Sequence, residues 1–328
     1  AAVAVEPWRV EWQEITVPDP GPDDVVVSVS HSWISNGTEG SFVRGERIAG
    51  DTPRSDTDPM PFPHVPGYQK VGAAEWVGGH VEHVRAGDMV FATVSRVHGM
   101  FYDSGGHVSP AVTHGSQVWK LPDGADPVAY SGLVLTQVGY NVGMRPALSP
   151  GDAAVVIGDG MVGHWSAQTL QHRGARVLML GRHPDRLELL ARGKGDAVVD
   201  ASDNPDWPAV VQRWAPEGVQ VIADTVGSIG AIEALLPLMR HNGHISSAGF
   251  YGHAGRIDIQ MLRAREITLH APAGWSKERM DATLAMVADG TLRTLDLITH
   301  TFPACEAGRA FDLILRRREP ALGVVLEW

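Results

Sequence analysis

The sequence predicts an α/β protein with two domains, one rich in short β-strands and one built on a doubly wound parallel sheet. Its 328 residues exceed the length of one typical domain. Residues 153–180 pass from an apolar run through a glycine-rich turn and a helical stretch to a second apolar run. Residues 1–120 instead carry short β-type runs between frequent Pro and Gly turns.

Composition narrows the class of protein. The chain is 44% hydrophobic and 20% charged, which is ordinary for a globular protein. Its formal net charge of −11 argues against nucleic acid or an anionic membrane as a partner. No run of eighteen apolar residues exists, and Ala1–Glu6 lacks the features of a signal peptide. The single cysteine, Cys305, excludes an internal disulfide, so a cytoplasmic location is expected.

The central segment predicts a dinucleotide site. Ala153–Ile157 reads as a buried parallel strand, a helix is expected over 161–173 with Gly174 ending it, and Arg176–Leu180 reads as the next strand. The turn between strand and helix is Gly158-Asp159-Gly160-Met161-Val162-Gly163. Its glycines allow a tight turn and a close approach of the backbone to a pyrophosphate at the helix N-terminus. This is the pattern of a Rossmann domain.

The end of the second strand indicates the cofactor. An NAD enzyme usually places an acid there, on the ribose 2′-hydroxyl. This chain has Gly181 and Arg182 instead. A glycine removes the repulsion of a 2′-phosphate, and the arginine offers it a planar fork of donors. NADP(H) is therefore expected, although Asp185 lies close enough to leave some use of NAD open.

Three further strands are expected in this domain: Val219–Asp224, Gly243–Phe250 and Ile267–His270. Ligands of open α/β sheets bind at the carboxyl ends of the strands. The predicted contacts at two of these ends are Thr225, Val226, Ala248, Gly249 and Phe250. The Rossmann domain is placed at residues 145–280.

The remaining residues are expected to form one β-rich domain, 1–144 completed by 281–328. Asp24–Ser30 reads as a strand, and residues 87–92 and 105–108 read as turns that lead into strands. The final residues read as a helix and then a strand at 322–326. Residues 46–60, rich in Asp, Pro and Gly, are expected to be a mobile surface loop.

Along nearly its whole length the chain resembles the medium-chain dehydrogenase/reductase superfamily, the alcohol dehydrogenase-like proteins. The segments that carry the resemblance are Pro18–Val25, Asn36–Glu39, Pro66–Gln69, Gly87–Val90, Gly105-Gly106, Leu121–Gly124 and the Rossmann turn. Each segment alone is only a modest signal of the superfamily, but the order and spacing of all of them together are specific for it. The resemblance implies a GroES-like catalytic domain beside the Rossmann domain, a small carbonyl or alcohol substrate, and a homodimer or homotetramer.

The chain departs from the zinc-dependent members of that superfamily at their ligands. Those members carry Cys-Gly-Thr-Asp and Gly-His-Glu where this chain has Asn36-Gly37-Thr38-Glu39 and Gly67-Tyr68-Gln69. Their third ligand corresponds to a position near Val134. Zinc prefers Cys, His, Asp or Glu, and the lone Cys305 cannot form a structural zinc lobe. No metal is therefore expected.

Two histidine pairs are weaker candidates for metal ligands, and four aromatic residues are weaker candidates for walls of the substrate pocket. His80-x-x-His83 and His241-x-x-His244 have a spacing that metals sometimes use, but they are expected to be surface histidines. Four aromatic side chains are candidate pocket walls or simply core: Trp33, Phe42, Tyr102 and Trp275.

Without zinc, a hydrogen-bond donor must stabilise the developing oxyanion. Tyr68 stands at a former ligand position and is the expected proton donor, or else an aromatic wall. By resemblance Thr38 is a proton relay, with turn stabilisation as the alternative. Glu39 is expected to orient neighbours, to bond a substrate hydroxyl, or to form a structural ion pair. Asn36 and Gln69 are expected to suit a hydroxyl-rich or carbonyl substrate.

Three functions remain open. The first is an NADPH-dependent, metal-independent enzyme that interconverts a ketone and a secondary alcohol; the motifs resemble members acting on hydroxyl groups of larger molecules, such as the bacteriochlorophyllide dehydrogenase-like group. The second is an enoyl or quinone reductase that reduces an activated C=C bond. The third is a non-catalytic NADPH-binding protein. Thr38 favours the first, because quinone reductases need no alcohol relay.

Overall fold

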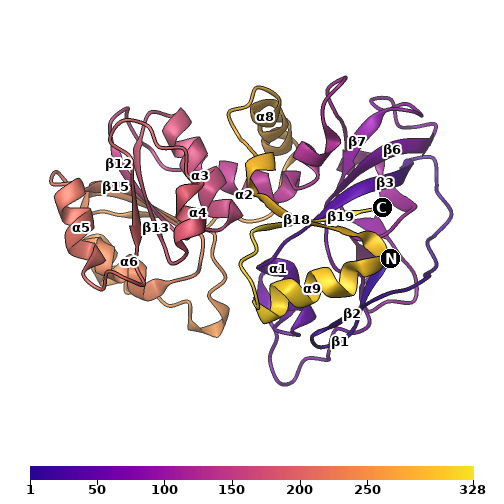
Figure 1. Cartoon of the computed structure of the whole chain (residues 1–328), viewed down its shortest axis with the longest axis horizontal. Helices are drawn as coiled ribbons and strands as arrows, with labels where there is room; N and C mark the ends of the chain where they lie inside the picture. The colour runs from indigo at the N-terminus through magenta and orange to yellow at the C-terminus, as the bar shows by residue number, and fades with distance from the viewer. The chain divides into compact units, whose positions relative to one another are not determined.

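The computed structural model describes all residues 1–328 and divides them into two compact units. The first unit comprises Ala1–Val134 with Thr294–Trp328, and the second comprises Leu135–Arg293 (Figure 1). These limits place most of α2 (Leu133–Met144) and all of α8 (Lys277–Ala288) in the second unit, whereas the sequence placed the domain limits at 144 and 281. Mixed and parallel sheets together confirm the predicted α/β class.

A seven-stranded sheet forms the first unit, with the order β11-β7-β6-β3-β19-β18; β10 pairs with the start of β3, and β19 pairs with its end. The strands are β3 (Asp24–Ile34), β6 (Lys70–Val77), β7 (Met89–Ala92), β10 (Ala111–His114), β11 (Val118–Lys120), β18 (Ile298–Pro303) and β19 (Gly323–Glu327). In β3, Val25, Val27 and Val29 alternate with more exposed residues, as expected for a strand with one buried face. The last strand returns to pair antiparallel with β3, where Val324 lies opposite Ile34.

Short hairpins and two helices complete the first unit. The hairpins pair β1 (Ala2–Glu6) with β2 (Arg9–Trp12), β4 (Arg47–Ala49) with β5 (Thr52–Pro53), and β8 (Ser95–Arg96) with β9 (Ser104–Gly105). The helices are α1 (Thr38–Val43) and α9 (Ala307–Arg316). One face of α9 buries Ala307, Ala310 and Phe311 in a core that also contains Ile34 and Val324. That face ties the end of the chain to the turn after β3.

One expectation for this unit was wrong in part. Residues 46–60 begin with the β4–β5 hairpin rather than a loose loop, because Arg47 is buried and anchors it; residues 54–60 are a surface segment without regular structure, as expected. The Arg47 guanidinium donates to Ser41 Oγ at 2.6 Å and to the Gly50 carbonyl at 3.1 Å. Residues 106–108 form the predicted turn, in which Gly106 lies directly against the backbone of Gly67 and Tyr68, and the strand that follows, β10, begins at Ala111.

The second unit is built on a six-stranded parallel sheet with the order β14-β13-β12-β15-β16-β17. The strands are β12 (Ala153–Ile157), β13 (Arg176–Gly181), β14 (Ala197–Asp200), β15 (Val219–Asp224), β16 (Met239–Ser247) and β17 (Thr268–His270). The predicted strands at 153–157 and 219–224 are confirmed residue for residue. β16 differs, because Met239 already pairs with Val219 and the chain leaves the sheet after Ser247.

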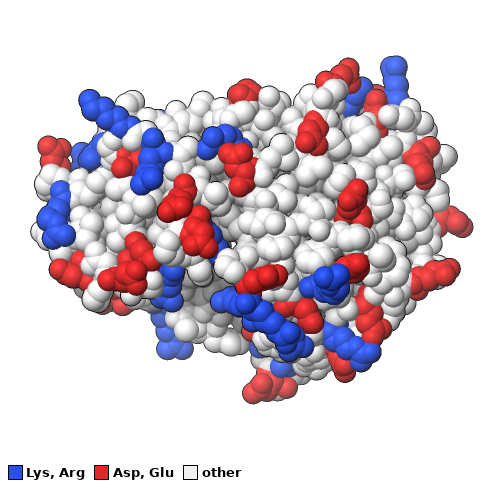
Figure 2. Space-filling view, in the orientation of Figure 1, with Lys and Arg blue, Asp and Glu red and all other residues white.

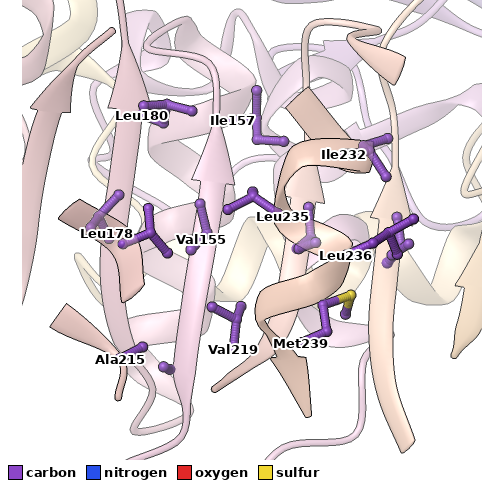
Figure 3. Packing of buried hydrophobic residues seen from close by; sticks show 14 of the residues in the cluster. Val155, Ile157, Leu178, Leu180, Ala215, Val219, Ile232, Leu235, Leu236 and Met239 are labelled. Carbon is purple, nitrogen blue, oxygen red and sulfur yellow. The ribbon is translucent and has the colours of Figure 1, made fainter. Parts of the chain in front are cut away.

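Helices pack against this sheet: α3 (Met161–His172), α4 (Pro184–Glu188), α5 (Trp207–Trp214), α6 (Ile229–Leu235) and α7 (Ile259–Arg263). The predicted helix over 161–173 is confirmed, and Gly174, with φ +86°, ends it as expected. Figure 3 shows side chains of β12 and β13 beside those of α6 and the turn that follows it. The residues in view include Val155, Leu178, Ile232, Leu235 and Met239. Truncating one of them to Ala is expected to destabilise the unit by about 2–5 kcal/mol.

Surface charge is mixed. On the face drawn in Figure 2, acidic and basic side chains are interspersed and form no broad basic patch. None of the helices has the length and apolar character required to cross a bilayer.

Candidate active site

Two groups of predicted site residues lie in different units and are described separately. The hydroxyl cluster of the first unit comprises Ser35, Thr38, Glu39 and Tyr68. The glycine turn of the second unit comprises Gly158–Gly163, at the carboxyl end of β12.

The turn between β3 and α1 carries most of the hydroxyl cluster. Glu39 fixes this turn by a reciprocal pair of hydrogen bonds with Ser35. The Glu39 N–H donates to the Ser35 carbonyl at 2.9 Å, and the Ser35 N–H donates to Glu39 Oε1 at 2.8 Å. Glu39 is only 1% exposed, so these bonds act in a dry environment where they are strong. The position of the Thr38 hydroxyl therefore depends on the Glu39 carboxylate.

Tyr68 meets this turn from a second segment. It follows Gly67, whose φ of +91° makes the sharp bend that directs the chain here. The side-chain hydroxyls of Ser35 and Thr38 hydrogen-bond to the Tyr68 phenol. Burial raises the pKa of Tyr68 well above its usual range, and the Glu39 carboxylate acts in the same direction. The two hydroxyls and the charge of Arg47 oppose this rise, and the phenol keeps its proton at neutral pH.

His107 is a member of this region that sequence reasoning missed. Its ring is fully buried, with Nε2 at 2.7 Å from Glu39 Oε2 and Nδ1 at 2.9 Å from Ser32 Oγ. The indole N–H of Trp328 donates to the same Ser32 oxygen at 2.8 Å. The signal in the sequence was Gly105-Gly106, since two glycines before a histidine permit a close backbone approach. Ser35 was missed because it is an ordinary strand-end serine in the sequence.

The other two predicted catalytic residues have different surroundings. Asn36 lies in the same turn; its Nδ2 donates to the Leu322 carbonyl at 2.6 Å, and its Oδ1 is buried without a partner. Gln69 is fully buried, and its Nε2 donates to the Trp33 carbonyl at 3.1 Å. That contact gives Gln69 a structural bond to the backbone of β3.

The residues at the three zinc-ligand positions do not suit a zinc ion. The Asn36 amide nitrogen is engaged with a carbonyl, the Tyr68 phenol holds its proton, and Val134 is a buried apolar residue. Glu39 directs both carboxylate oxygens at Ser35 and His107. No three His, Cys, Asp or Glu side chains are grouped as metal ligands would be. The donor set therefore disagrees with zinc chemistry.

The histidine pairs behave differently from one another. His80 contacts Asp23 at 3.1 Å and His83 contacts the Val118 carbonyl, so the two histidines do not converge. In the second pair, His241 is exposed, as expected, and His244 is half-buried in β16. The Nδ1 atom of His244 lies 3.0 Å from Nε2 of His270 in the neighbouring β17.

Among the candidate wall residues, Trp33 is core. It is fully buried, and glycines at 132 and 323 leave the space that its ring fills. Phe42 and Tyr102 form an edge-to-face pair with ring centroids 5.9 Å apart, and the Tyr102 hydroxyl donates to the Ile48 carbonyl.

The glycine turn has the geometry that a pyrophosphate needs. Gly158 has φ +115°, and a Cβ on it would lie 2.5 Å from Thr225 Oγ1. A Cβ on Gly163 would collide with the Gly158 carbonyl, so both glycines are required by packing. Gly160 precedes the first turn of α3, where Met161 and Val162 lie, and a Cβ there would meet nothing within 4 Å. The space at the N-terminus of α3 is thus open to an anion.

The predicted residues at the ends of β15 and β16 lie together. Thr225 Oγ1 donates to the Ile157 carbonyl at 2.9 Å, which joins this end to the glycine turn. The Ala248 N–H donates to the Asp224 carbonyl, Gly249 packs against Gly227, and the Phe250 backbone also lies against Gly227. Val226 is 56% exposed, an apolar surface beside the turn. These residues line one edge of the sheet, as a nicotinamide cofactor requires.

Asp224 holds this edge in place and was not predicted. Its carboxylate accepts hydrogen bonds from the backbone N–H groups of Val226, Gly227 and Ser228 and from the Tyr251 hydroxyl. Burial and the bond to Asp224 raise the pKa of Tyr251 above its usual range.

The end of β13 contains an acid that the sequence did not assign there. Asp159, inside the glycine turn, accepts hydrogen bonds from the N–H groups of Arg182 and His183 at 2.7 and 2.8 Å. A Cβ on Gly181 would lie 2.5 Å from Asp159 Oδ2, so this carboxylate fills the space of a side chain at 181. Three basic residues surround it, since His183 Nδ1 lies 3.0 Å away, Arg186 lies 3.8 Å away and the exposed Arg182 adjoins it.

Comparison with known proteins agrees with this architecture. Residues 162–289 match the family model described as zinc-binding dehydrogenase. Over the full chain and 98% of the relative, the sequence is 27% identical to 2-desacetyl-2-hydroxyethyl bacteriochlorophyllide A dehydrogenase of Cereibacter sphaeroides. It is 26% identical to 5-exo-hydroxycamphor dehydrogenase of Pseudomonas putida, over 96% of this chain and 95% of the relative.

A solved structure shows the same fold. Alcohol dehydrogenase TADH from Thermus sp. ATN1 superposes with a TM-score of 0.84 at 23% identity, over 100% of this chain and 99% of that one. The glycine turn, the two units and these matches agree with one another. The chain is therefore similar, in its central residues and over its whole length, to dehydrogenases of the medium-chain dehydrogenase/reductase superfamily.

Proposed function

We propose that the protein is a metal-independent, NADPH-dependent oxidoreductase that interconverts a ketone and a secondary alcohol. The observation that carries the proposal is the protonated Tyr68 phenol, hydrogen-bonded by the hydroxyls of Ser35 and Thr38. By resemblance, Tyr68 occupies the position at which the zinc-dependent members of the superfamily carry a metal ligand. A phenol can do part of the metal's work there, because it can donate a hydrogen bond to a carbonyl oxygen.

In the direction of reduction, a nicotinamide cofactor held at the glycine turn would supply a hydride to the carbonyl carbon. Tyr68 gives its proton to the carbonyl oxygen, so that the C=O bond becomes an alcohol. The Ser35 and Thr38 hydroxyls then donate to the phenolate oxygen and stabilise it until a solvent proton returns. Asn36 Oδ1, buried and without a partner, is a ready acceptor for a hydroxyl on the substrate.

The proposal for NADP rests on the basic group around the end of β13. Arg182, His183 and Arg186 lie around Asp159, while Asp185 follows in the chain and Asp200 lies opposite Gly181 in β14. Asp159 already accepts two backbone N–H groups, which leaves it little capacity to bind a ribose diol. The guanidinium groups of Arg182 and Arg186 offer charged donors that suit a 2′-phosphate.

Arg182→Ala is expected to weaken NADPH binding about 10- to 100-fold, the loss of one charge-assisted contact. NADH binding should change less than about threefold on the same argument. Titration of cofactor fluorescence would measure both dissociation constants. Arg213→Ala, which removes another exposed arginine on α5, serves as the control. Equal losses for both cofactors would contradict the NADP proposal.

The reaction itself is tested by NADPH oxidation against cyclic and sugar-derived ketones, enones and quinones, with EDTA present throughout. Turnover of saturated ketones, unchanged by EDTA, is the expected result. Turnover of enones with saturated ketones inert would instead establish a C=C reductase. Tight NADPH binding without turnover of any compound would indicate a non-catalytic binding protein. Inactivation by EDTA that added zinc reverses would overturn the metal-free chemistry.

A further inference from the structure

We propose that His107 is a positioning residue, which holds the Glu39 carboxylate and thereby aligns the Ser35 and Thr38 hydroxyls on Tyr68. The inference rests on the proposed function, since it assigns a task within the hydroxyl cluster. His107 acts on the hydroxyl cluster through Glu39.

Geometry places the imidazole directly beneath the segment that carries Tyr68. A Cβ on Gly67 would lie 2.8 Å from both Cδ2 and Nε2 of His107, so only glycine leaves room for the ring. The backbone N–H of His107 also donates to the Pro66 carbonyl at 3.1 Å. On its other side the ring reaches Glu39 Oε2 at 2.7 Å. One side chain therefore touches both segments that build the hydroxyl cluster.

The available donors give the buried chain of hydrogen bonds a single direction. The Trp328 indole can only donate, so Ser32 Oγ accepts from it. The Ser32 hydroxyl hydrogen is then free to point at His107 Nδ1, 2.9 Å away. Nε2 must then carry the ring's hydrogen and donate it to Glu39 Oε2. We infer the Nε2–H tautomer, with Glu39 as the final acceptor.

Packing alone does not account for this arrangement. The ring makes an edge-on contact with Phe311 at 5.9 Å between centroids, which a phenylalanine could also make. Burying an imidazole, a carboxylate and a serine hydroxyl is unfavourable unless each is paired. Here every nitrogen and both carboxylate oxygens have a partner. This chain of hydrogen bonds ends at Ser35, which is one of the two residues whose hydroxyls bond to Tyr68.

Loss of the His107 donor would leave Glu39 Oε2 buried and unpaired. The carboxylate would then turn or draw in water, and its hold on the Ser35 N–H would loosen. Misplacement of a reacting group by about 1 Å can lower a rate about 100-fold. The expected defect is therefore in kcat and not in binding.

Kinetics of three variants test this role. His107→Phe should lower kcat for ketone reduction at least about tenfold, with both KM values within about twofold. His107→Gln keeps an N–H donor near the position of Nε2, so it should recover kcat to within about threefold of wild type. His64→Phe replaces another buried histidine of this unit and should leave kcat unchanged. Thermal melting of each variant reports folding. Wild-type kcat in His107→Phe would overturn the inference, as would equal defects in the Phe and Gln variants.

A second measurement does not require turnover. In ¹⁵N-histidine-labelled protein, NMR should show His107 with a protonated Nε2, an unprotonated Nδ1 and a slowly exchanging Nε2 proton far downfield. Glu39→Gln should shift that proton upfield, because a neutral acceptor is weaker. A protonated Nδ1, or exchange of the Nε2 proton at solvent rates, would contradict the inferred chain.

The two measurements separate the inference from the proposed function. Wild-type protein that reduces no ketone but shows this NMR pattern would overturn the proposed function and leave the hydrogen-bond chain standing. Active wild-type protein with undiminished His107→Phe would overturn the positioning role and leave the proposed function standing.

Discussion

Replacing Tyr68 with phenylalanine is expected to lower kcat for ketone reduction by about 100-fold or more, the usual contribution of a positioned general acid. The substitution removes one oxygen and keeps the ring, so the walls of the site should be preserved. Affinity for NADPH should stay within about twofold, since a group acting on the transition state leaves ground-state binding unchanged. Steady-state kinetics and a cofactor titration measure the two quantities.

The pH dependence adds a second criterion. Because the pKa of Tyr68 is raised by burial and by Glu39, the phenol keeps its proton across the range in which such assays are run. Ketone reduction should therefore show no loss from ionisation of Tyr68 up to about pH 10, the ordinary tyrosine pKa. Alcohol oxidation needs the phenolate, so its rate should rise with pH over the same range.

Tyr130→Phe provides the matched control, because it removes a buried phenol elsewhere in the first unit. Its kcat should equal that of wild type. If Tyr68→Phe retains kcat within about threefold, a factor far below general-acid catalysis, Tyr68 is only a wall of the site.

Lys70 makes the stability of the protein depend on pH. It is the first residue of β6, two positions after Tyr68, and its side chain is fully buried. Nζ donates to the Thr93 carbonyl at 2.8 Å and lies 3.5 Å from the Gly105 carbonyl. Burial lowers the pKa of Lys70 from 10.5 to about 7, and no carboxylate is among its hydrogen-bond partners.

The lowered pKa makes stability depend on pH in a defined window. Between about pH 7 and 10.5 the unfolded chain holds a proton on Lys70 that the folded chain has released. Stability from this group is therefore fully present above 10.5, falls as the pH falls, and is lost below about 7. The whole change is on the order of 5 kcal/mol, because the pKa of Lys70 falls from 10.5 to about 7.

Lys70→Met removes the titrating amine and keeps a long flexible side chain. At pH 6 to 7 the variant should be more stable than wild type by about 2–3 kcal/mol, because it also loses the bond to Thr93. The advantage should shrink as the pH rises toward 10. Denaturant midpoints of both proteins at several pH values would measure the difference, in which other titrating groups cancel.

Lys70→Arg is the informative partner variant, since a guanidinium cannot release its proton and should destabilise the fold at every pH. Parallel curves of stability against pH for wild type and Lys70→Met would show that Lys70 does not titrate in this window.

Much of the second unit could be predicted because its signals are local. The strand 153–157, the glycine turn and the end of the helix at Gly174 each follow from a few adjacent residues. β16 was placed four residues late, because Arg240, His241 and Asn242 do not look like a strand interior. The pairing of Met239 with Val219 decides that boundary, and such pairing is not visible locally.

The hydroxyl cluster was only half predictable for the same reason. Thr38, Glu39 and Tyr68 were identified through resemblance, and the structure brings them together with Ser35. His107 lies 68 residues from Glu39 in the sequence, and nothing local links the two. A buried Lys70 was equally invisible, because a lysine in a strand is usually on the solvent side.

The contact between Asp159 and Gly181 makes these two positions inseparable in evolution and in engineering. An acid introduced at 181 to favour NAD would meet a carboxylate already seated there, since a Cβ alone comes within 2.5 Å of Asp159 Oδ2. The same acid becomes sterically acceptable once position 159 is small. Cofactor preference can therefore change along one order of substitutions, 159 first and 181 second, while the reverse order passes through a damaged intermediate.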